Sequence, residues 1–219
     1  VGVTTPPRVV LDFKKDVFGL GADRRSFAGM ISFTRASEAT GIGPGGAPIT
    51  YGVNEPVYDW STGRRGLLLR PAAGARAADV ARLTLGDWWT GAAGGLEVRG
   101  RVLAAPGGFD RVMELHDGTT TNRVSVLFNA SLGQLVFGVY VANVAQAVLV
   151  GPATAYAPGV DFDLKGRYGP NDFSFQRDTA AVLTDTLGTV PPALTTLQLA
   201  ASVGGSNPAA VLFTRLVVF

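Results

Sequence analysis

Two pairs of acidic residues have the spacing that a glycoside hydrolase needs. Asp161 and Asp163 lie two positions apart, and Asp110 and Glu114 lie four positions apart. Glycoside hydrolysis uses two carboxyl groups about 5–9 Å apart, and alternate positions of a strand place both on one face. Because most carboxylates of folded proteins are simply exposed to solvent, we interpret both pairs as solvent-facing residues at strand ends.

A second hypothesis is that Asp161 and Asp163, together with oxygen ligands further along the chain, form a calcium site at the rim of the fold. Calcium takes carboxylate and amide oxygens, and four residues would supply them: Asp161, Asp163, Asn171 and Asp172. Asn171 and Asp172 directly follow Gly169 and Pro170, so ordinary turn chemistry accounts for them. We expect no cofactor, with calcium at this set as the alternative.

Aromatic side chains near loops are the candidates for binding sugars, because a flat ring can stack on a pyranose while polar neighbours bond its hydroxyls. Trp88 and Trp89 form the most conspicuous pair, and Tyr156 and Tyr168 follow. The alternative is burial in a core or an interface, where tryptophan is also enriched. Neighbouring residues of a strand point to opposite faces, so at least one of the two tryptophans is expected to be buried.

The composition excludes several classes of site. The chain of 219 residues has no cysteine, which excludes disulfides, thiolate metal sites and a cysteine nucleophile. A single histidine, His116, cannot build a zinc site that needs several imidazoles, and no Gly-x-Ser-x-Gly motif offers it a nucleophile. The net charge of +2 is spread along the chain, whereas nucleic-acid binding needs clustered positive charge.

The chain ends and apolar runs predict neither export nor membrane insertion. The first eight residues show no basic region followed by an apolar segment, so we expect no secretory signal. No apolar run approaches the roughly 18–20 residues of a membrane span.

The pattern of residues predicts an all-β fold. Gly (29) and Pro (13) together make about a fifth of the chain, although 47% of its residues are hydrophobic, and this combination is typical of many short strands joined by turns. From residue 96 onward apolar and polar residues alternate over runs separated by turn signals every 8–12 residues. We expect an antiparallel β-sandwich whose core includes four residues of two adjacent runs: Val126, Phe128, Phe137 and Val139.

The composition also predicts two regions. Residues 1–75 are rich in Gly, Pro and Arg and hold only short apolar pieces, and we expect an N-terminal attachment segment that can add strands to the sandwich. Residues 76–219 form the expected β-sandwich.

Three runs of the N-terminal segment resemble, in their order and spacing, a segment that is common in bacteriophage and prophage virion proteins. These runs are residues 32–40 (SFTRASEAT), 54–59 (NEPVYD) and 63–69 (GRRGLLL). In such proteins a lectin-like jelly roll of the concanavalin A-like or laminin-G-like type often follows. The resemblance therefore implies this jelly roll for residues 76–219.

The resemblance also implies a function. It implies a non-enzymatic structural component of a phage or phage-like particle surface, such as a tail fibre, head fibre, spike or capsid decoration, with host surface glycans as ligands. Its partners would be other virion proteins and further copies of itself, most plausibly in a trimer. It would act on the virion surface after assembly in the bacterial cytoplasm. The alternatives are a carbohydrate-active hydrolase and a free carbohydrate-binding module with the same sandwich fold.

Overall fold

The computed structural model describes residues 9–12, 17–20, 23–25, 32–34, 39–42, 48–51, 67–71, 80–85, 91–154 and 156–219. These residues form strands joined by turns, with one 3-10 turn at Val203–Gly205. Within the described ranges no helix is long and apolar enough to cross a membrane. The expectation of an all-β fold is therefore confirmed.

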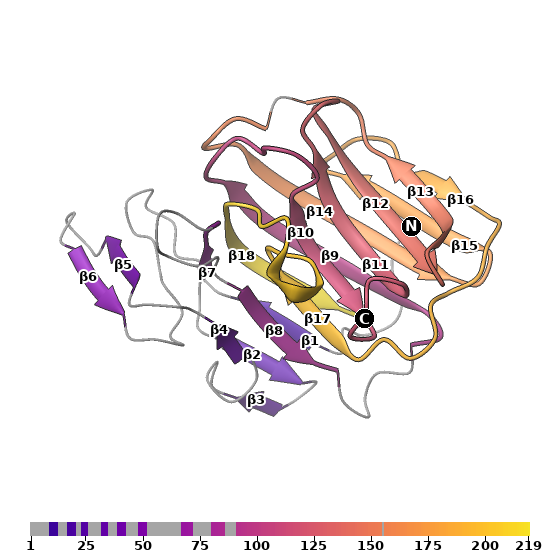
Figure 1. Ribbon diagram of the computed structural model, residues 1–219, viewed down its shortest axis with the longest axis horizontal. Coiled ribbons are helices and arrows are strands. Elements are labelled where there is room, and N and C mark those ends of the chain that lie inside the picture. Colours follow the sequence, from indigo (N-terminus) through magenta and orange to yellow (C-terminus); the bar gives the residue numbers. More distant parts are fainter. Residues whose placement is uncertain are drawn as a thin grey trace.

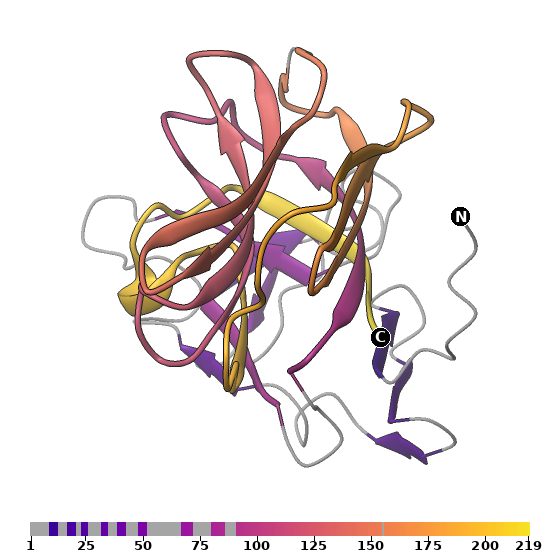
Figure 2. The same cartoon turned by 90° about the vertical axis from the view of Figure 1, so that its right-hand side faces the viewer.

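Two antiparallel sheets face each other as the layers of a sandwich (Figures 1 and 2). The first, sheet A, contains in spatial order β16 (Leu183–Asp185), β15 (Asp172–Arg177), β14 (Asp161–Gly169), β9 (Gly94–Val102), β18 (Val211–Val218), β1 (Val9–Asp12), β2 (Val17–Leu20) and β3 (Asp23–Arg25), and β7 (Leu67–Leu69) also pairs with β18. The last strand of the chain, β18, thus lies between β9 and β1.

The second layer, sheet B, contains β13 (Val144–Val150), β12 (Gln134–Val141), β11 (Arg123–Asn129), β10 (Arg111–His116), β17 (Thr196–Leu199), β8 (Val80–Thr84) and β4 (Ser32–Thr34), again in spatial order. A small separate sheet pairs β5 (Ala39–Ile42) with β6 (Pro48–Tyr51), at the left of Figure 1. Strands β1 and β4 show that backbone from the first 75 residues pairs with both layers of the sandwich.

The core lies between the layers and is rich in aromatic rings. The four residues expected there, Val126, Phe128, Phe137 and Val139, are each at most 1% exposed, so this prediction is confirmed. The ring of Phe137 stacks on that of Phe175 from sheet A, with centroids 5.7 Å apart. A Cβ atom at Gly166 of β14 would come within 2.7 Å of the Phe137 ring. The sheets therefore approach closely because residue 166 has no side chain.

Replacing Phe128 by alanine tests this core. The ring of Phe128 lies 4.9 Å from Tyr156 and 6.2 Å from Phe162, measured between centroids. We expect Phe128→Ala to lower the free energy of unfolding by about 3–5 kcal/mol, because transfer energy is lost and a cavity remains. In urea unfolding, the control Leu132→Ala, at a side chain that is 57% exposed, should change it by less than about 0.5 kcal/mol. A loss below about 1 kcal/mol for Phe128→Ala would mean that Phe128 does not face the core, as after a one-residue error in strand register.

Candidate functional site

The outer face of sheet A, which points away from the core, carries a dense set of polar side chains. Buried and exposed residues alternate along β9, β14 and β15, so every second side chain of these strands points outward. The outward set is Glu97, Arg99, Arg101, Asp161, Asp163, Lys165, Arg167, Asp172, Ser174 and Gln176.

Three ion pairs organise this face. Arg99 Nε lies 2.9 Å from Asp163 Oδ2, and Arg101 Nε lies 2.8 Å from Asp161 Oδ1. Both pairs join opposite positions of β9 and β14. Further along β14, Arg167 Nη2 lies 2.6 Å from Asp172 Oδ2. Most charges on the face are therefore neutralised by a neighbour.

Beside these pairs the face is hollowed. The hollow has a volume of about 270 Å³ and spans β9, β14, β15 and β16, with the last residue, Phe219, at its side. It is lined by Leu96, Glu97, Lys165, Gly166, Arg167, Asp172, Ser174, Gln176, Val182, Thr184 and Phe219. This volume lies just below the range of pockets for drug-sized ligands, so it suits a small ligand or one end of a larger one.

Several polar groups in the hollow have no partner among the residues that the structure describes. Lys165 is opposite Glu97 in the pairing of β14 with β9, but no ion pair forms between them within the described residues. Gln176 Nε2 donates to Ala180 O at 3.0 Å, which leaves its Oε1 to accept. Together with the hydroxyls of Ser174 and Thr184, the hollow offers both donors and acceptors.

An aromatic ring forms one wall of the hollow. The backbone N–H of Phe219 donates to Gly95 O at 3.0 Å, which holds the residue beside β9. A Cβ atom at position 95 would come within 3.3 Å of the Phe219 ring, so glycine lets the ring lie close to the sheet. The hollow thus combines an apolar wall with hydrogen-bonding groups, which is the combination that sugar rings require.

The aromatic residues expected to bind sugars fall in different places. Trp88 and Trp89 lie outside the described residues. Tyr168 is fully buried in the core between the sheets, which leaves no ring face for a sugar, and burial raises the pKa of its hydroxyl. The pattern contained this signal, since Tyr168 shares its face of β14 with Phe162 and Leu164.

Tyr156 lines a second hollow, at one end of the sandwich. This hollow of about 290 Å³ is lined by Ala105, Pro106, Phe128, Asn129, Ala130, Gly133, Thr154, Tyr156 and Ala157. Tyr156 is only 6% exposed, and its burial raises the pKa of the hydroxyl to about 12. The guanidinium of Arg177 lies 5.2 Å from the centre of its ring. Because the ring is covered and the lining carries few polar side chains, this hollow offers a sugar less than the outer face of sheet A does.

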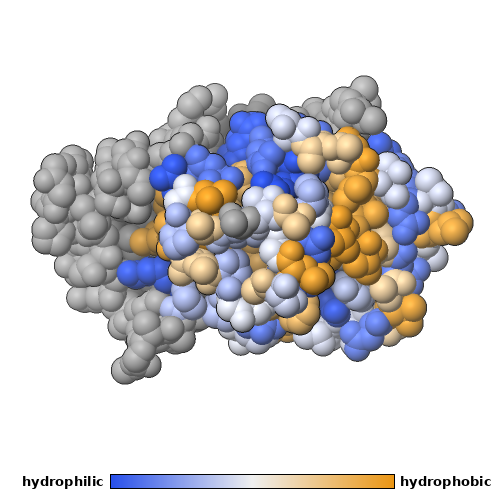
Figure 3. Space-filling model, turned by 90° about the horizontal axis from the view of Figure 1, so that it is seen from above, coloured by the Kyte–Doolittle hydropathy of each residue, from blue (hydrophilic) through white to orange (hydrophobic). Residues whose placement is uncertain are grey.

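Seen from above, the described surface has hydrophilic areas and, right of the centre, a continuous hydrophobic band (Figure 3). Three exposed large apolar side chains, Val144, Val148 and Val150, follow one another along the edge strand β13. The other exposed large apolar side chains are Phe109, Leu132, Val182 and Leu187.

The four residues considered for calcium do not come together. Asp161 and Asp163 lie near the start of β14, whereas Asn171 and Asp172 lie at its far end. At about 3.3 Å per residue, more than about 20 Å of strand separates the two pairs. Each carboxylate instead faces an arginine, and Asn171 Oδ1 accepts from Gly188 N at 3.0 Å. Among the described side chains no group of three His, Asp or Glu residues could hold a metal ion.

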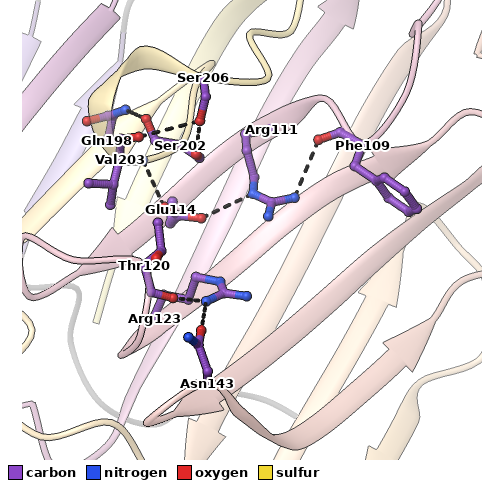
Figure 4. Close-up of polar contacts among 10 residues, drawn as sticks. All are labelled: Phe109, Arg111, Glu114, Thr120, Arg123, Asn143, Gln198, Ser202, Val203 and Ser206. Carbon is purple, nitrogen blue, oxygen red and sulfur yellow. Dashed lines mark hydrogen bonds and ion pairs between the residues drawn. The ribbon is translucent and has the colours of Figure 1, made fainter.

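The second acidic pair, Asp110 and Glu114, was interpreted as solvent-facing, which is wrong for Glu114 because contacts within the chain bury it. Asp110 Oδ2 accepts from Gly107 N at 2.8 Å. Glu114 is fully buried on the outer face of sheet B, and Figure 4 shows it between Arg111 and the turn at Val203. Glu114 Oε2 accepts from Arg111 Nε and Oε1 from Val203 N, both at 3.1 Å. Its role is to anchor the 3-10 turn over β10.

Further polar contacts hold the same turn and the neighbouring hairpin in place (Figure 4). Gln198 donates to the carbonyl of Ser202, and the hydroxyls of Ser202 and Ser206 are 2.7 Å apart. Arg123 donates to the carbonyl of Thr120 and, at 3.2 Å, to Asn143 Oδ1. The outer face of sheet B around β10 and β17 is thus occupied by contacts within the chain, unlike the hollow of sheet A.

His116 lies at the end of β10 and supports the turn that follows. It is 5% exposed, and its Nδ1 accepts from Gly118 N at 3.0 Å. Burial lowers the pKa of the imidazole, more than the nearby Glu114 raises it. The side chain is therefore neutral in the folded protein near neutral pH.

Sequence reasoning did not identify Glu97, Lys165 and Arg167 as residues that line one hollow. Each is a polar residue at an alternate position of a strand, which by itself indicates only a solvent-facing side. Their convergence depends on how β9, β14 and β15 pair, which the local pattern does not reveal. The sequence did contain one signal for a polar face: polar residues occupy every second position in all three of these strands.

Comparison with known proteins supports the fold. No family model and no curated protein matches the chain in sequence. The binding domain of botulinum neurotoxin DC, solved in complex with SialylT, has a TM-score of 0.61 at 8% identity, over 97% of this chain and 47% of that one. NanB, solved with optactamide, has a TM-score of 0.56 at 12% identity, over 70% of this chain and 25% of that one.

A second NanB structure, the sialidase of Streptococcus pneumoniae, has a TM-score of 0.50 at 12% identity, over 61% of this chain and 23% of that one. The chain thus spans a quarter to a half of the proteins that it resembles. At these identities the likeness shows the fold alone, a β-sandwich.

The lowered pKa of His116 predicts how stability depends on pH. The unfolded imidazole takes up a proton near pH 6.5, whereas the folded one stays neutral to lower pH. As the pH falls below that value, the unfolded state gains protons first and stability falls, by at most about 1.4 kcal/mol per pH unit for one site. Urea unfolding from about pH 7 to about pH 5 should show a shallower loss in His116→Gln than in the wild type. Equal losses of stability with falling pH in His116→Gln and in the wild type would contradict the lowered pKa of His116.

Proposed function

We propose that the chain is a non-enzymatic carbohydrate-binding protein that uses the hollow on the outer face of sheet A. The observation that carries this proposal is the set of unengaged donors and acceptors around Lys165, Glu97 and Ser174 beside the ring of Phe219. Sugar hydroxyls both donate and accept, and the apolar face of a pyranose packs on an aromatic wall. The sandwich fold shared with the toxin binding domain agrees with such a role.

Binding, rather than hydrolysis, fits the carboxylates of this face. Among the residues that line the hollow, Asp172 is held by Arg167, and Glu97 is the other carboxylate. Asp161 and Asp163 are each paired with an arginine. Glycoside hydrolases need two carboxyl groups on either side of the scissile bond, and the lining leaves one that is not engaged.

The proposal extends to the setting in which the protein acts. The order of motifs in residues 32–69 supports display on the surface of a phage or phage-like particle, with host surface glycans as ligands. In this view residues 1–75 attach the sandwich to other virion proteins, and the protein assembles in the bacterial cytoplasm before release.

A blocking substitution tests the binding site. We expect Ser174→Trp, which places a large ring in the hollow, to weaken binding to immobilised oligosaccharides and envelope polysaccharide by at least about tenfold. Thr120→Trp, an equally large change at an exposed position of sheet B's β10–β11 turn, should bind as the wild type does. Equal binding by Ser174→Trp would place the site elsewhere. Release of sugar from the polysaccharide would contradict the non-enzymatic role.

Self-association is the second prediction of this proposal. Only 16% of the residues are charged, against about 25% in ordinary soluble domains, so apolar surface remains that a neighbouring copy would cover. We expect an oligomer, with the trimer of phage fibres as its form. The run Val211–Phe219, which the sequence offered as a contact, is ruled out, because β18 is a buried strand inside sheet A. The loops around Gly43–Gly46, the other candidate contact, lie outside the described residues. Light scattering at several concentrations should give about three times the mass of one chain. The mass of a single chain at all concentrations would contradict it.

A further inference from the structure

The side-chain charges that line the hollow cancel. Two cations, Lys165 and Arg167, face two anions, Glu97 and Asp172. Arg167 is neutralised directly by Asp172 at 2.6 Å. Lys165 and Glu97 lie at opposite positions of neighbouring strands, so a ligand above one of them is also close to the other.

The neighbouring positions of the face are also nearly neutral. Arg99 and Arg101 are each paired with an aspartate. Arg215 of β18 is opposite Arg99 and does not line the hollow. Its charge acts through water, where salt screens it over about 10 Å. Among the described side chains, therefore, none gives the hollow a strong positive potential that would attract an acidic ligand.

The hydrogen-bonding groups point to the same class of ligand. The ammonium of Lys165 can only donate and the carboxylate of Glu97 can only accept, whereas the hydroxyls of Ser174 and Thr184 do both. The hydroxyls of a neutral sugar can satisfy all of these groups. A sugar carboxylate can only accept, so beside Glu97 it would meet a like charge and leave an acceptor without a donor.

We infer that the hollow binds a neutral hexose at the end of a glycan in preference to an acidic sugar such as a sialic or uronic acid. This inference rests on the proposed function. Glu97 accepts from sugar hydroxyls, Lys165 donates to them, and Phe219 with Val182 packs against the apolar face of the ring. The volume of about 270 Å³ matches one or two sugar rings.

Matched pairs of glycans test the inference on the full chain. The probes are immobilised galactose and galacturonate, glucose and glucuronate, and lactose and sialyllactose. We expect the neutral member of at least one pair to bind more tightly, with an affinity that changes less than about twofold between about 0.05 and about 0.5 M NaCl, because no ion pair forms with the ligand. Tighter binding of the acidic members would overturn the inference and leave the proposed function standing. If the protein binds neither any of these probes nor host envelope polysaccharide, both the inference and the proposed function are overturned.

Two double variants separate the hollow from the rest of the face. Glu97→Gln with Asp172→Asn removes both anions of the hollow, and we expect it to shift the preference toward the acidic member of a pair by about tenfold. Arg101→Gln with Asp161→Asn removes one ion pair of the same face without changing its net charge, and should leave the preference unchanged. Thermal melts confirm that both variants fold. An unchanged preference in the first folded variant, or an equal shift in both, would show that the hollow does not select the ligand.

Discussion

The close contact between Phe137 and Gly166 determines which residues the protein presents to its surroundings. Phe137 projects from sheet B, stacks on Phe175 of sheet A and occupies the space that a side chain at position 166 would need. Gly166 must therefore face the core, and its neighbours Lys165 and Arg167 must face outward. A slip by one residue would exchange the two faces of β14. One aromatic contact in the core thus fixes the orientation of the polar hollow on the outside.

The ion pairs of the outer face order the site more than they stabilise the fold. Pairs such as Arg99–Asp163 remain partly exposed, and exposed pairs contribute about 0–1 kcal/mol each. Their effect is to keep long side chains along the strands and to engage the carboxylates that could otherwise bind cations. Lys165 and Glu97 differ from these pairs because they are opposite each other without being joined, so they stay available to a ligand.

The sequence was informative wherever a property depended on neighbours along the chain. The alternation in β11 and β12 correctly placed Val126, Phe128, Phe137 and Val139 inside, and the same rule applied to β14 would have placed Tyr168 inside as well. Properties that depend on strand pairing could not be predicted from the sequence. Asp161 meets Arg101, a residue 60 positions earlier, and only the register of β9 with β14 reveals it. The calcium set failed for the same reason, since proximity in sequence across a turn does not bring together the two ends of a long strand.

The position of β18 within sheet A also governs the order in which the chain can fold. Strands β9 and β1 have no pairing with each other and are joined through β18, which is made last of all the described strands. During synthesis β14 can already pair with β9 and β1 with β2, but β1, β2 and β3 are not joined to the rest of sheet A until residues 211–218 have left the ribosome. Contacts between such distant segments form slowly, because a long loop must close first. Sheet A is therefore completed only after translation of its central strand, and until then the edges of β9 and β1 are open to chaperones and to other nascent chains.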